Sequence, residues 1–534
     1  TDGHMYFFDL LNPNNNDSEN TYRLVAQNDC TAFPEVTTNV TGDLNNLKGD
    51  VNAPIRGWVD PHTHITSYEF MGGKFMHGEP FARWGVEEAL RDSKDIHGPN
   101  GSLDLIGNIY AYNDVSHTYN TEGWPNFPDW PAYNNLSHMG YYYKWMERAY
   151  LSGLRMVTTA LVENEVLCWA QSTIVPTSWA GANSCNIMDS LRLQVQRLHE
   201  MQDYIDAQSG GPGKGWFRLV SSPEQARAVI ADGKLAVLMG VEASETFDCG
   251  LKDECNRNTV EAKLNELYDL GIRTIYPTHK FDNELGGSAV EDGIMNLGEY
   301  LSTGRFFETK ECDDETAGKS FTSGFPLLGE VDFVSDILNI IGLNPQYDET
   351  IEHCNQHGLS GLGVYLVNRL IDKKMLIELD HLSNDSATAV MDIVEARGYS
   401  GVITSHSWMR DGKNGALHAN TKRLFQAGGF GSPYNGNAHS MGGKVSKYLD
   451  VIEQTPYLAG VGIGSDMSGL GGQAGPRGDV ATNPLVYPFT NEFGFTFEKQ
   501  VSGNRIYDLN VDGIAHYGLL GDQIQDMRML NSNR

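Results

Sequence analysis

The chain has 534 residues, of which 40% are hydrophobic, and its 39 Lys+Arg against 69 Asp+Glu give a formal net charge of −30. This acidic balance repels nucleic acid and anionic membrane surfaces, so neither is expected as a partner. No apolar run approaches the ~18 residues that a membrane-spanning helix needs, so no such segment is expected.

Residues 1–50 are rich in Asn, Asp and Thr and show no clear periodicity. They are predicted to form an N-terminal extension of loops and short strands. The opening residues include GHM, which is a frequent cloning remnant, and they carry no part of the interpretation.

From Gly57 onward, short apolar runs are repeatedly followed by a polar residue of catalytic type and then by glycine or a helix. The predicted strands are GWVDPH ending at His62, LRMVTTALV at 154–162, LAVLMGVE ending at Glu242, IRTIYPTH ending at His279, KMLIELDH ending at His381, GVITSH ending at His406, a weak run at 428–430, and AGVGIGSD ending at Asp466. Helical patterns separate several of them, at 188–208, 259–271 and 386–398.

Strands that alternate with helices are typical of parallel βα units. Eight such units predict a TIM-like (β/α)8 barrel over residues 51–480, a single fold that can reach this length with insertions. An open doubly wound sheet is the alternative, but the first strand is not followed by the glycine-rich phosphate-binding fingerprint of that fold.

Two long insertions interrupt the repeat, at about 67–150 and 282–374, and the first contains the aromatic stretches GWPNFPDWPAYNN and GYYYKWMERAY. Both are expected over the C-terminal face of the barrel, either as a substrate lid or as peripheral decoration. Residues 481–534 are expected to pack on the barrel as a C-terminal segment.

There are seven cysteines and no C-x-x-C pair, which argues against a structural zinc knuckle. Cys168 and Cys185 bracket one loop, and Cys249 and Cys255 bracket another, so both pairs are candidate disulfides. Local pairs of this kind favour an oxidising compartment, and a secreted or periplasmic location is expected rather than a cytoplasmic one. Buried, reduced thiols are the alternative.

A barrel brings the ends of its strands to one axial site. The polar residues at these ends are His62, His64, Glu242, His279, His381, His406 and Asp466. In an extended segment residues i and i+2 point the same way, so His62 and His64 can face one ion. Imidazole suits Zn²⁺ and a carboxylate can bridge two ions, so the set predicts two divalent metal ions, with zinc as the first choice.

Six segments in this order resemble the amidohydrolase superfamily, and within it the membrane (renal) dipeptidase branch, peptidase family M19: GWVDPHTH, LMGVEASE, YPTHKFDN, IELDHLS, VITSHS and VGIGSDMSG. They cover roughly residues 57–470. The resemblance implies a binuclear metal-dependent hydrolase that cleaves an amide or peptide bond of a small molecule by a metal-bridging hydroxide. A homo-oligomer is left open.

The resemblance also implies a role for each residue. Glu242 would bridge both metals, with His62 and His64 on the first and His381 and His406 on the second. Asp466 would complete the metal site and shuttle the proton, and His279 would polarise the scissile carbonyl. Asn283 and Arg410 are further candidate substrate contacts.

Two departures bear on the substrate. His64 stands where the dipeptidase branch has aspartate, which makes the first metal site richer in nitrogen. The dipeptidase branch binds the substrate carboxylate with an arginine. Here the corresponding segment offers Arg410 and Arg423, and neither stands at a matching position. A lactonase or esterase of the same superfamily therefore stays an alternative, and a non-catalytic binding barrel is a second one.

Overall fold

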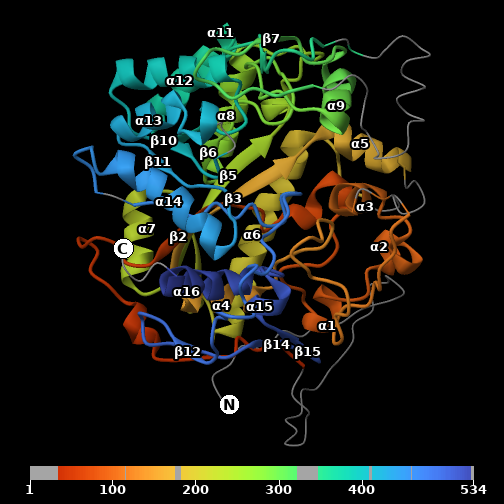
Figure 1. Cartoon of the computed structure of the whole chain (residues 1–534), viewed down its shortest axis with the longest axis vertical. Helices are drawn as coiled ribbons and strands as arrows, with labels where there is room; N and C mark the ends of the chain where they lie inside the picture. The colour runs from red at the N-terminus through yellow and green to blue at the C-terminus, as the bar shows by residue number, and fades with distance from the viewer. Residues whose placement is uncertain are drawn as a thin grey trace, which may run out of the picture.

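The computed structural model describes residues 34–530 apart from 113, 115, 175–181, 322–344, 346, 408–411 and 459. At its centre is a sheet with the strand order β11-β10-β9-β6-β5-β3-β2, and β4 also pairs with β5 (Figure 1). All of these pairings are parallel. The strands are β2 (Trp58–Thr63), β3 (Leu154–Glu163), β4 (Phe217–Val220), β5 (Leu235–Ala243), β6 (Ile272–Ile275), β9 (Leu376–Glu378), β10 (Val402–Thr404) and β11 (Phe430–Gly431).

Residues 462–467 close this sheet into a ring. On one side the Ile463 N–H donates to the Val59 carbonyl of β2 at 3.0 Å. On the other side the Gly464 N–H donates to the Pro433 carbonyl, just after β11, at 3.1 Å. An open sheet would leave both edge strands unpaired. The predicted (β/α)8 barrel is therefore confirmed, and the doubly wound alternative is wrong.

Helices lie between successive strands of the barrel (Figure 1). They are α5 (Glu165–Ile174), α6 (Ile187–Gln208), α7 (Pro223–Ala231), α8 (Arg257–Asp269), α11 (Gly361–Asp372), α12 (Asn384–Arg397), α13 (Ala419–Gln426) and α14 (Ala438–Ile452). The three predicted helices correspond to α6, α8 and α12 within two residues at each end. Each begins after a polar side chain that accepts a first-turn N–H, namely Asn186, Asn256 and Ser383.

Several strands are shorter than the sequence predicts. β6, β9 and β10 stop two to four residues before His279, His381 and His406. The chain turns at these points, and His381 itself has a left-handed backbone with φ +65°. The last predicted strand, AGVGIGSD, is not a regular strand. Residues 462–467 instead make isolated backbone hydrogen bonds to the segments on either side. These histidines therefore lie on turns above the barrel.

The insertion at 67–150 contains four of the described helices (Figure 1): α1 (Val86–Ala89), α2 (Lys94–His97), α3 (Leu105–Tyr112) and α4 (Tyr143–Leu151). Part of it packs on the loop that follows Asp466, where the Gly140 N–H donates to Ser468 Oγ at 3.1 Å. The Gln473 N–H also donates to the Tyr133 carbonyl, at 2.8 Å. The aromatic stretch thus lies beside the mouth of the barrel.

The second insertion holds α9 (Gly293–Thr303) and the antiparallel pair β7 (Thr309–Glu311) and β8 (His353–Asn355). Its Ala289 N–H donates to the His381 carbonyl at 2.7 Å, so it also reaches the mouth. The two ends of the chain share a small sheet, in which β1 (Val40–Thr41) pairs with β13 (Thr496–Phe497) and β13 with β12 (Phe489–Thr490). The C-terminal segment continues with β14 (Gln500–Ser502), β15 (Arg505–Tyr507), α15 (Leu509–Asp512) and α16 (Leu520–Leu530).

Both predicted cysteine pairs are disulfides, Cys168–Cys185 and Cys249–Cys255. A third, Cys312–Cys354, links the residue after β7 to β8 across a sequence separation of 42 and was not predicted. None of the helices in the described part of the chain is long and apolar enough to cross a membrane.

Candidate metal centre

Seven polar side chains, all buried except the slightly exposed His279, meet at the C-terminal end of the barrel. They come from β2 and the residue after it, from β5, from the turns after β6, β9 and β10, and from the closing segment: His62, His64, Glu242, His279, His381, His406 and Asp466. Their potential ligand atoms form three groups within 4.8 Å: His62, His64 and Glu242; His62, His406 and Asp466; and Glu242, His279 and His381. The structure thus brings together all of the predicted metal ligands.

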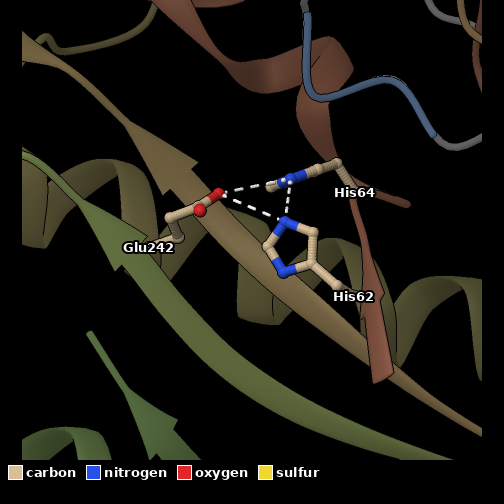
Figure 2. Close-up of side chains that lie close together, drawn as sticks. All are labelled: His62, His64 and Glu242. Carbon is tan, nitrogen blue, oxygen red and sulfur yellow. Dashed lines mark hydrogen bonds and ion pairs between the residues drawn. The ribbon is translucent and has the colours of Figure 1, made fainter. Parts of the chain in front are cut away.

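The carboxylate of Glu242 lies between two pairs of imidazoles. Its Oε2 is 3.3 Å from His64 Nε2 and 3.6 Å from His62 Nε2, and Figure 2 shows the carboxylate pointing from β5 toward this pair. Its Oε1 is 3.1 Å from His381 Nε2 and 3.4 Å from His279 Nε2. Oε1 is buried and makes no well-aligned hydrogen bond within the described residues. A carboxylate that faces two imidazole pairs in this way fits a ligand shared between two cations.

The pKa values of the two carboxylates of the centre are lowered. Burial raises the pKa of Glu242, but the neighbouring His279 and His62 outweigh it and hold the pKa well below its usual value. Burial also raises the pKa of Asp466, and hydrogen bonds from His62 and His64 again outweigh it and lower the pKa. Ionised carboxylates are the form that binds a metal ion.

The pKa values of three of the imidazoles are lowered. Burial, followed by the charge of His406, lowers the pKa of His62, and burial lowers that of His381 well below its usual value. Burial lowers the pKa of His279 to about 3. For His64 and His406 burial also acts to lower the pKa, but Asp466 and Asp380 respectively outweigh it and raise the pKa. Neutral imidazole is the ligand form for a divalent cation, and the lowered pKa values of His62 and His381 favour that form.

The far ring nitrogens of three histidines are held by groups that the sequence did not single out. His64 Nδ1 is 2.9 Å from the Ala160 carbonyl, and His406 Nδ1 is 3.0 Å from Asp380 Oδ2. Asp380 also accepts the backbone N–H of His406 at 2.8 Å. A carbonyl or carboxylate on Nδ1 fixes the tautomer that presents Nε2 to a metal.

The third such contact joins His62 Nδ1 to the Tyr276 hydroxyl at 2.8 Å. Tyr276 lies one residue after β6 and is buried. Sequence offered little signal for these partners. Asp380 is the neighbour of His381 in sequence, but it contacts His406, which follows a different strand. Tyr276 belongs to the same motif as His279, but it contacts His62.

Two of the site residues have left-handed backbones, His381 with φ +65° and Asp466 with φ +48°. Non-glycine residues avoid this region unless the surrounding structure imposes it, and such strain concentrates at functional sites. Gly469 fits close against Asp466, because a Cβ there would collide with Asp466 Oδ1. The turn after Asp466 is thus shaped around its carboxylate.

Two of the seven side chains are more exposed than the others. The side chains of Asp466 and His279 are 12% and 10% exposed, whereas those of His62, His64, Glu242, His381 and His406 are at most 4% exposed. Asp466 and His279 are the two residues predicted to act on the substrate. They therefore stand where a bound molecule would approach.

Asn283 has a different position from the one predicted. Its amide nitrogen donates to the carbonyls of Ser244 and Pro277, and its amide oxygen accepts the N–H groups of Leu285 and Gly286. No hydrogen-bonding capacity is left for a substrate, so Asn283 braces the loop after His279. Arg410, the other predicted substrate contact, lies outside the described residues.

No protein-family profile matches the chain, and no curated protein matches it. Similar solved structures include an amidohydrolase from Pseudomonas aeruginosa, at 12% identity and TM-score 0.38, covering 73% of this chain and 86% of that one. Another is a metallopeptidase from Rhodobacter sphaeroides liganded with a phosphinate mimic of the dipeptide L-Ala-D-Ala, at 13% identity and TM-score 0.37, covering 73% and 84%. Similarity of this extent carries no inference about activity.

Proposed function

We propose that the chain is a metal-dependent hydrolase that cleaves an amide or peptide bond of a small molecule. The observation that carries this proposal is the position of Glu242, whose two oxygens face separate imidazole pairs at the C-terminal end of the barrel. That end is where barrel enzymes place their catalytic residues.

The donor set fits two divalent cations. His62 and His64 would hold one beside Glu242 Oε2. His381, which is 3.1 Å from Oε1, would hold the other together with His406, whose Nε2 is 3.0 Å from that of His381, while His279 faces the substrate. When bound, such ions polarise a substrate carbonyl and make water nucleophilic near neutral pH, and imidazole-rich sites favour zinc.

Asp466 and His279, the two most exposed side chains of the centre, act on the substrate. Asp466 Oδ1 is 3.1 Å from His64 Nε2, and its ionised carboxylate takes a proton from the attacking water and returns it to the leaving amine. His279 is a neutral imidazole, and it donates an N–H to the carbonyl oxygen as that atom gains negative charge. Both roles use groups that are already desolvated.

We also propose that the protein folds in an oxidising compartment and is secreted or periplasmic. Three disulfides support this, because such bonds persist mainly outside the reducing cytosol.

The proposed function is tested by metal analysis and a substrate panel. Purified protein is expected to hold about two equivalents of Zn, Mn or Fe, and to hydrolyse a member of a panel of dipeptides, N-acyl amino acids, β-lactams and lactones. Asp466→Asn is expected to keep its metal but to lose about 10²–10⁴-fold in kcat. Protein that takes up no metal and hydrolyses nothing after metal addition contradicts the proposal. Turnover of lactones alone replaces the amide assignment with a lactonase.

A further inference from the structure

Two hydroxyl groups lie directly beneath the centre, on Tyr276 after β6 and on Ser405 after β10. Both side chains are buried, with 1% and 0% exposure. The Tyr276 hydroxyl is 2.8 Å from His62 Nδ1 and 2.7 Å from Ser405 Oγ. Ser405 Oγ is in turn 3.2 Å from His62 Nδ1 and 3.3 Å from His406 Nδ1. The pair therefore touches histidines from two different strands.

The direction of these hydrogen bonds follows from the chemistry of imidazole. A neutral histidine that binds a cation through Nε2 carries its proton on Nδ1, so His62 Nδ1–H donates to the Tyr276 oxygen. Tyr276 then donates its own proton to Ser405 Oγ. His406 Nδ1–H has a separate acceptor, the carboxylate of Asp380.

A buried carboxyl group inside the barrel contacts the backbone of Ser405. Glu378, the last residue of β9, is completely buried and accepts the Ser405 backbone N–H at 2.9 Å. This bond holds the backbone of Ser405 beside the histidines. His406 contacts its carboxylate, Asp380, directly, in the carboxylate–histidine–metal arrangement that sets ligand orientation.

The same pair holds two imidazoles together. The rings of His62 and His406 stack at a centroid distance of 3.8 Å with an interplanar angle of 7°. In the proposed function these two histidines serve different cations. A contact that fixes both rings therefore acts on the spacing between the two metal positions.

We propose that Tyr276 and Ser405 are positioning residues that fix the tautomer and orientation of His62 and its stacking on His406. The inference rests on the proposed metal centre and adds a shared support for its two halves.

Tyr276→Phe keeps the ring and removes only the hydroxyl, and Ser405→Ala removes the second hydroxyl. Each is expected to weaken metal affinity by about 10–100-fold, the range for outer-shell partners of metal ligands. The double variant should lose more than either, because the Ser405 contact at 3.2 Å still supports His62 in Tyr276→Phe. Affinity is measured by competition with a chelator, and ligand geometry by the visible spectrum of the Co²⁺-loaded protein.

Tyr507→Phe is the matched control. Tyr507 is also fully buried, and within the described residues its hydroxyl makes no hydrogen bond. It should keep wild-type affinity and an unchanged Co²⁺ spectrum. Urea midpoints of all variants show whether the fold is intact, so that a loss of metal is not confused with unfolding.

His62→Ala separates this inference from the proposed function. If His62→Ala binds metal as tightly as the wild type, the proposed centre itself fails. If His62→Ala loses metal while Tyr276→Phe and Ser405→Ala keep wild-type affinity and spectrum, the centre stands and the positioning role is overturned. Equal losses in Tyr276→Phe and the Tyr507→Phe control also overturn it.

Discussion

The molecule contains a second group of buried histidines, and the contrast with the metal centre is instructive. His77, His97 and His138, here called the insertion histidines, all lie in the 67–150 insertion and are at most 3% exposed. Their rings contact one another, with centroids 4.7 to 6.0 Å apart. They are three rather than five, but they are as deeply buried as the histidines at the strand ends.

Their hydrogen bonds point elsewhere. Nε2 of His77 and of His97 each contact a backbone carbonyl at 2.8 Å, and His97 Nδ1 pairs with the Tyr119 hydroxyl. His138 stacks on Trp130 at 4.6 Å. No set of three ligand atoms among the insertion histidines falls within 4.8 Å. Converging Nε2 atoms around a shared carboxylate, rather than the number of histidines, thus distinguish a candidate metal centre from a packed core.

The largest effect expected to separate the two groups comes from Glu242→Gln. An amide has one carbonyl oxygen and cannot face both imidazole pairs as an anion, so metal affinity should fall by more than about 100-fold, beyond the range for outer-shell partners. Metal content by mass spectrometry and chelator competition provide the measurement. Wild-type metal content in this variant would remove Glu242 as the shared ligand.

Asp380→Asn is expected to have an intermediate effect. The amide removes the negative charge that faces His406 Nδ1 at 3.0 Å, and it replaces one of the two oxygens that accept the Thr404 hydroxyl and the His406 N–H groups by an NH2 group. The support of His406 is therefore weakened. Metal affinity should fall by about 10–100-fold. Asp372→Asn, an exposed carboxylate paired with Arg397, serves as the control and should leave affinity unchanged. Equal affinities in the two variants would contradict the support assigned to Asp380.

The smallest effect is expected from Tyr119→Phe, which acts on the insertion histidines. Its hydroxyl is 2.8 Å from His97 Nδ1 and 3.0 Å from Asp104 Oδ2, and its loss leaves a buried polar group without its partner. The free energy of unfolding should fall by about 1–3 kcal/mol. Metal content should be unchanged, as measured on the same samples as the urea titration. Loss of metal here would mean that the two histidine groups are not functionally separate.

The barrel and the convergence of the candidate ligands were predictable from sequence because each signal was local. A buried strand reads as an apolar run, and the polar residue that ends it marks the C-terminal face. The His-x-His spacing of His62 and His64 is likewise visible within three residues. The two short disulfide loops, closed by Cys185 and Cys255, belong to the same class of local signal.

The missed features depend on contacts between distant segments. Asp380 supports a histidine on the next strand, and the Cys312–Cys354 disulfide joins residues 42 apart. The left-handed backbones of His381 and Asp466 arise from turns that propensities do not encode. Asn283 is a candidate substrate contact from sequence, but its amide is fully used in hydrogen bonds within and beside its own loop.

The closure of the ring by residues 462–467 has a consequence for biogenesis. His64 and Asp466 are 402 positions apart in the chain but 3.1 Å apart in space. A growing polypeptide therefore cannot assemble the full set of donors until nearly all of the barrel has been synthesised and its last segment has paired with β2. Loading of the ions would then be a late event in maturation, and a truncated product lacking that segment would leave the first histidines without their partner.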